Sequence, residues 1–114
     1  MYHGDVKITY VNRSMNKDLP KIFIFDADDY PSHDDAVVSK VMPDVKSKSS
    51  HTFEIPKKSK IYWGMASKVK EGQPINEVKL HNDKFFEHNL EGVSKSTVAL
   101  NDDGKKGYQF HIED

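Results

Sequence analysis

Apolar and polar residues alternate with a period of two along much of the chain, which is the spacing of a β-strand that buries one face. The alternation is clearest in residues 6–10, 51–55 and 108–112, where apolar or aromatic side chains occupy every second position. Each of these segments is predicted to be a strand with one face toward the core. Pro56 is expected to end the second of them, because proline cannot donate to a strand ladder.

Two further segments carry apolar side chains on both faces. Residues 22–25 read Ile-Phe-Ile-Phe, a run typical of a central strand that is covered on both sides. Residues 61–65 form an aromatic strand in which Trp63 shares one face with Ile61 and Met65.

The end of the chain predicts a β-hairpin, in which 96–100 and 108–112 are strands and 101–107 is a polar turn with two glycines. Weaker strands are predicted at 78–80 and 86–90. At most one short helical turn is expected, near 34–42. There, a form of capping box precedes apolar residues at helical spacing, although the three valines favour a strand.

Roughly seven to nine short strands without long helices predict an all-β fold. We expect a single-domain antiparallel β-sandwich over residues 1–114, with a small β-barrel as the alternative. Parallel pairs are not expected, because helical crossover segments of about a dozen residues are missing.

Composition narrows the function classes. The 114 residues include no cysteine, which excludes disulfides, thiolate metal sites and thiol nucleophiles. A net charge of −1 gives no global basic field for nucleic acid.

The beginning of the chain and its longest apolar run bear on location. The first residues lack the features of a signal peptide, so a cytoplasmic location is expected, with leaderless export or a removed leader as open alternatives. The longest apolar run, 22–25, is far shorter than the ~20 residues of a membrane-spanning helix.

Charge is unevenly distributed along the chain. Residues 18–35 contain six aspartates and one lysine, a net charge of −5, whereas residues 40–60 contain six lysines and two acidic residues, a net charge of +4. The basic window suits an acidic partner or head-to-tail association. The interpretation we favour is that its lysines discourage aggregation at strand edges.

The acidic segment after the 22–25 strand is a candidate metal site. Calcium takes six to eight oxygen ligands, and a loop rich in carboxylates supplies them. The candidate ligands are Asp26, Asp28, Asp29, Asp34 and Asp35. The spacing is not that of an EF-hand, and the alternative is that these aspartates form Asx turns and cap the next segment.

Two tyrosines are candidate ligand-binding residues. Tyr62 and Trp63 place large rings on opposite faces of one strand, and Gly64 allows a close approach to its backbone. An outward Tyr62 ring can stack on a sugar or a partner protein, as can Tyr30 in the acidic segment. The alternative is that Tyr62 packs beneath a loop while Trp63 anchors the core.

No catalytic motif is present, and the six histidines repeat no zinc-ligand spacing. We therefore expect a non-enzymatic binding module, lectin-like in character, that recognises a protein or carbohydrate through loops of the sandwich. Two alternatives stay open: a small hydrolase-like enzyme that uses His33 or His51 with nearby carboxylates, and a structural or assembly subunit.

Overall fold

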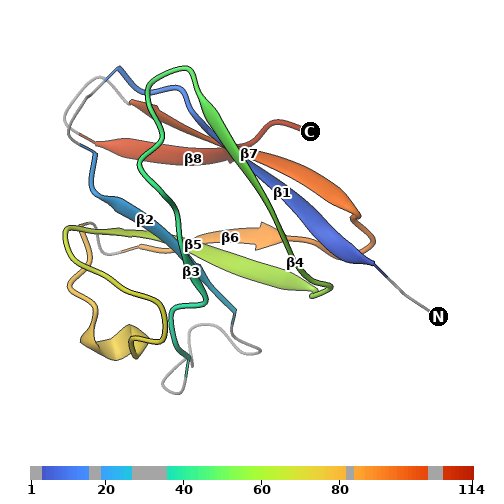
Figure 1. Cartoon of the computed structure of the whole chain (residues 1–114), viewed down its shortest axis with the longest axis horizontal. Helices are drawn as coiled ribbons and strands as arrows, with labels where there is room; N and C mark the ends of the chain where they lie inside the picture. Colours follow the sequence, from blue (N-terminus) through green and yellow to red (C-terminus); the bar gives the residue numbers. More distant parts are fainter. Residues whose placement is uncertain (1–3, 16–18, 27–35, 82–83, 103–106) are drawn as a thin grey trace. The chain divides into compact units, whose positions relative to one another are not determined.

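The computed structural model describes residues 4–15, 19–26, 36–81, 84–102 and 107–114, and these residues form eight strands and one short 3-10 helix (Figure 1). The strands are β1 (Asp5–Asn12), β2 (Lys21–Phe25), β3 (Lys40–Val41), β4 (Ser50–Pro56), β5 (Lys60–Ala66), β6 (Phe86–Asn89), β7 (Lys95–Asp102) and β8 (Tyr108–Ile112). The helix is η1 (Ile75–Glu77).

The strands belong to two four-stranded sheets, with the orders β4-β1-β7-β8 and β3-β2-β5-β6. Two separate sheets without a closed barrel among the described residues are the architecture of an all-β sandwich, so the predicted fold class is confirmed. The chain divides into two compact units that each contain one sheet. Unit 1 comprises Met1–Leu19, Asp44–Ser59 and Leu90–Asp114, and unit 2 comprises Pro20–Pro43 and Lys60–Asn89.

β1 lies inside the sheet of unit 1, and its alternation is that predicted from the sequence. Val6, Ile8 and Tyr10 are buried on one face. On one side Ile8 pairs with Phe53 of the antiparallel β4, and on the other it pairs with Ser96 of β7. The hairpin of β7 and β8 is also confirmed.

The pairing of β1 with β7 is parallel, which corrects the expectation that all strands are antiparallel. A parallel pair needs a long connection but not a helical one. Here the connection is the whole of residues 13–94, which includes every strand of unit 2. The expectation was wrong because it considered only connections between consecutive strands.

The segment between β2 and β4 contains no helix in its described part, residues 36–49. Val37 forms an isolated antiparallel bridge with Pro74, and residues 40–41 form β3. In place of the strand predicted at 78–80, Leu80 forms only an isolated bridge with Ala66. The helical turn among the described residues is η1, which lies before this bridge and not near 34–42.

β2 is the central strand predicted from its apolar run, because it lies between β3 and β5 and four of its residues are buried. Phe23 pairs directly with Gly64 of β5. The Phe23 ring covers the glycine so closely that a Cβ on Gly64 would lie 2.6 Å from the ring's Cζ atom. The close approach that Gly64 allows is therefore filled by a ring of the same sheet.

One face of the unit 2 sheet carries an aromatic cluster. Its buried strand residues are Phe23, Phe25, Tyr62 and Ala66, and segments of the same unit complete it with Val38, Ile75 and Val78. The rings of Phe25 and Tyr62 stack with centroids 5.3 Å apart, and Phe85 meets Phe25 edge-on at 4.8 Å. Loops of unit 2 thus cover this face of their own sheet.

Trp63 lies on the opposite face of β5 and is fully buried. Its indole N–H donates to Nδ1 of His88 at 3.1 Å, and His88 is 1% exposed. Because Nδ1 accepts a hydrogen bond, His88 is neutral in this arrangement. The pair satisfies a buried donor that would otherwise lose its hydrogen bond to water.

We predict that Gly64→Ala destabilises the protein by about 1–3 kcal/mol, because the new methyl group overlaps the buried Phe23 ring. Urea denaturation measures the free energy of unfolding. The matched test is the same substitution in a Phe23→Leu background, where the smaller side chain should recover about 1 kcal/mol of the cost. An equal cost in both backgrounds would show that the contact with Phe23 is not the cause.

Candidate functional site

Most residues of the predicted acidic site lie outside the described residues, namely Asp28, Asp29, Tyr30, Asp34 and Asp35, together with His33. Asp26 is described and partly exposed, directly after β2. Among the described residues no group of three or more histidine and acidic side chains could hold a metal ion. Calcium binding by the acidic segment therefore stays a prediction.

Tyr62 does not point outward, so its predicted stacking on a ligand does not fit the structure. Its side chain is 0% exposed and stacks on Phe25 within the aromatic cluster. Burial is the main cause that raises the pKa of its hydroxyl. The structure matches the alternative, because loops of unit 2 cover Tyr62 and Trp63 is buried as well.

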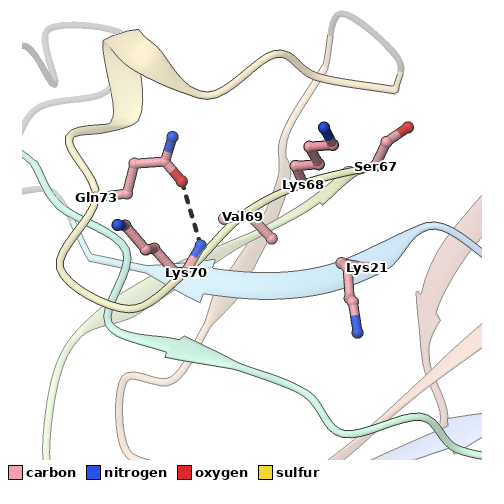
Figure 2. Close-up of a pocket in the computed structure, with 6 residues that line it drawn as sticks. All are labelled: Lys21, Ser67, Lys68, Val69, Lys70 and Gln73. Atoms are coloured by element: carbon pink, nitrogen blue, oxygen red, sulfur yellow. Dashed lines mark hydrogen bonds between the residues drawn. The ribbon is translucent and has the colours of Figure 1, made fainter.

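The described residues offer a candidate site in unit 2, an open depression of about 400 Å³ (Figure 2). Its lining residues are Lys21, Ser67, Lys68, Val69, Lys70 and Gln73. Lys21 is the first residue of β2 and pairs with Ala66, the last residue of β5. The depression therefore lies where one strand begins, its neighbour ends, and the next loop leaves the sheet.

Backbone hydrogen bonds hold this loop in place. The N–H of Gly72 donates to the carbonyl of Val38 at 2.8 Å, and the N–H of Val38 donates to the carbonyl of Gln73 at 2.9 Å. Gly72 has a φ of +83°, a conformation that favours glycine. The side-chain oxygen of Gln73 accepts from the N–H of Lys70 at 3.2 Å (Figure 2). The lysines thus extend from a tethered loop.

The electrostatic character of the depression is one-sided. Of the six described residues that line it, three are lysines and none is acidic. In Figure 2 the three lysine side chains leave the backbone in different directions and do not converge on one point. Lysine is a point charge on a flexible stem, so this arrangement suits an anion with several separated charges better than one small ion.

Sequence reasoning missed this site because lysines are frequent throughout the chain. Lys68 and Lys70 follow the end of the predicted aromatic strand two positions apart, which was the only available signal. Lys21 lies more than 40 positions earlier and joins them only through the pairing of β2 with β5.

A second polar group lies in unit 1 and joins the end of β1 to the end of the chain. Arg13 donates to both carboxylate oxygens of Glu113, at 2.5 and 2.8 Å, and Nε2 of His111 lies 3.2 Å from Oε2 of the same carboxylate. The hydrogen bond from Arg13 is the main cause that lowers the pKa of Glu113. Since every partner is another protein group, we interpret this group as a structural clamp.

A comparison of the chain with protein-family models, curated protein sequences and solved structures finds no match. In the described part of the chain, no helix has the length and apolar character needed to span a membrane.

We predict that the clamp contributes stability that depends on pH. A carboxylate whose pKa is lowered by folding stabilises the folded state above its ordinary pKa of about 4.5, and this contribution is lost as the pH falls through the lowered value. The decrease in unfolding temperature caused by Glu113→Gln should therefore be larger near pH 6 than near pH 2.5. Thermal unfolding over this range measures the difference.

The control is Glu71→Gln, which removes an exposed carboxylate from a loop of unit 2. Its effect on the unfolding temperature should be small at both pH values. A Glu113→Gln effect that is the same at both pH values would contradict the ionic role of the clamp.

Proposed function

We propose that this chain is a non-enzymatic binding module whose lysine-lined depression takes an extended anionic ligand, with sulfate or phosphate groups repeated along it. The observation that carries this proposal is that the described lining residues include three lysines and no acidic side chain. The loops of a rigid sheet are the usual platform for recognition, which supports a site at this place.

Multivalency is the reason for choosing a chain of oxyanions. A single exposed lysine paired with one anionic group contributes only about 0–1 kcal/mol. Several such contacts with one connected ligand raise its affinity together, because every contact after the first forms within the complex already made. Ser67 and Gln73 provide neutral polar groups, and the half-buried Val69 provides a small apolar contact.

The overall charge of the chain makes the local arrangement important. With a net charge of −1, the protein as a whole does not attract polyanions. Binding would therefore depend on the lysines of the depression and weaken as salt screens them. A sulfated oligosaccharide fits the carbohydrate-binding expectation from the sequence, and inorganic polyphosphate offers the same charge pattern without sugar rings.

We predict that calorimetric titration with a sulfated hexasaccharide detects binding, and that Lys68→Ala combined with Lys70→Ala weakens it about tenfold or more, since two charge contacts are lost. The matched control is Lys79→Ala combined with Lys95→Ala, which removes the same charge from exposed positions outside the depression. A parallel titration with polyphosphate of similar length shows whether the sugar rings contribute.

If both double variants weaken binding equally, the ligand responds to the total charge of the protein, and the proposal that it binds in the depression is contradicted. Absence of binding to both polyanions at low salt would contradict the proposed ligand class. Titrations with added calcium and with a chelator test the separate proposal that the acidic segment, including Asp26, holds calcium.

A further inference from the structure

β4 is an edge strand of unit 1. The sheet order β4-β1-β7-β8 pairs it with β1 on one side, and no described strand pairs with its other side. Strand edges carry backbone donors and acceptors that can pair with another chain, and proteins normally manage them explicitly.

The hydrogen bonds of β1 identify which groups of β4 face outward. Lys7 and Arg13 direct their N–H groups toward β7, to the carbonyls of Ser94 and Leu100. Asn12 bonds toward the β4 side of β1, since its N–H donates to the carbonyl of Ser49 and its carbonyl accepts from the N–H of Lys48. By alternation, Tyr10, Ile8 and Val6 face β4 like Asn12.

Their partners in β4 are His51, Phe53 and Ile55, so the backbone groups of Ser50, Thr52 and Glu54 point away from the sheet. All three outward residues are exposed. Within the described ranges, no backbone hydrogen bond to these three residues is formed from outside the strand. The edge therefore offers a short ladder of backbone groups to an added strand.

Lysines stand at both ends of this ladder. Lys46 and Lys48 precede β4, and Lys57 and Lys58 follow it. Lys48 has a φ of +68° and, with Ser49, opposes the single residue Asn12, so it occupies a bulge position where glycine is usual. The basic window found in the sequence is thus divided between the two ends of one strand edge.

The charges determine which occupant fits. Pairing with a second β4 would bring like-charged lysines together, and Pro56 offers no N–H to continue the ladder. An acidic strand meets opposite charge at each end instead. Because both ends are basic, this complementarity holds for either strand direction.

We propose that the outer edge of β4 binds an extended segment of a partner protein that has acidic residues at both ends and a neutral centre. The centre lies beside Ser50, Thr52 and Glu54, and Glu54 disfavours an acidic residue directly opposite itself. This interaction uses unit 1 alone and is independent of the lysine-lined depression in unit 2.

The test uses the full chain and a synthetic peptide of about eleven residues, which spans the edge at roughly 3.3 Å per residue. The peptide has two aspartates at each end and alternating threonine and valine between them. Amide exchange measured by NMR is the readout. Binding should slow exchange at Ser50, Thr52 and Glu54, whereas His51, Phe53 and Ile55 are already hydrogen-bonded to β1 in the free protein.

Two control peptides separate strand addition from simple charge attraction. One carries lysines in place of the aspartates, and the other keeps the aspartates but has N-methylated backbone groups in its centre. Neither should protect the three outward amides. Equal affinity of the N-methylated peptide would overturn the proposal, because charge alone would then account for binding.

Charge reversal tests the role of the basic ends. Lys46→Glu combined with Lys57→Glu should weaken the acidic peptide about tenfold or more, since two attractive contacts become repulsive. Lys79→Glu combined with Lys95→Glu is the matched control and should have a much smaller effect. The Lys68→Ala and Lys70→Ala variant should bind the peptide like the unmodified protein, which keeps this outcome separate from that of the depression.

Two other results would overturn the proposal. One is absence of protection at millimolar acidic peptide. The other is slow amide exchange at Ser50, Thr52 and Glu54 in the free protein at high concentration. That result would show that a second copy of the chain occupies the edge.

Discussion

The structure of unit 1 depends on the parallel pairing of β1 with β7. These strands are separated by more than 80 positions, and between them the chain forms all of unit 2 and β4. Such a pair forms only after the intervening chain has closed a large loop, which carries an entropic cost before any contact repays it. Once it has formed, β1 is an inner strand, and β4 and β8 become the two edges. The clamp of Arg13 and Glu113 joins the residue after β1 to the residue after β8.

Unit 2 follows a different constraint, which is local close packing across one strand pair. Gly64 lacks the side chain that would displace the Phe23 ring, so the tip of the ring lies close to Gly64 and the ring helps to build the aromatic cluster. That cluster is covered by loops of its own unit, which is why Tyr62 is buried. The loop after β5 returns to bond with the segment before β3, and the lysine-lined depression forms at the base of that loop. The candidate site is thus a consequence of how one sheet face is covered.

The alternation of residues 6–10, 51–55 and 108–112 predicted the strands β1, β4 and β8. The expected burial of one face was wrong for β8, where Tyr108 and Phe110 are only half-buried and Ile112 is exposed. The apolar run at 22–25 likewise predicted a central strand. Alternation carries no information about which strands pair, so the parallel pair was missed. A strand that is apolar on both faces also does not show which ring points outward, so Tyr62 could not be placed. The depression was missed because Lys21 reaches the other lysines only through strand pairing.

Native-state hydrogen exchange of the intact chain tests the central pairing most directly. In β1, the amides of Val6, Ile8 and Tyr10 face β4, and those of Lys7, Thr9 and Val11 face β7. If β1 is an inner strand, both sets exchange with similarly high free energies of opening, because both are bonded within one cooperative sheet. If Lys7, Thr9 and Val11 exchange as rapidly as the outward amides of Ser50, Thr52 and Glu54, β1 is not paired with β7 and is not an inner strand of unit 1.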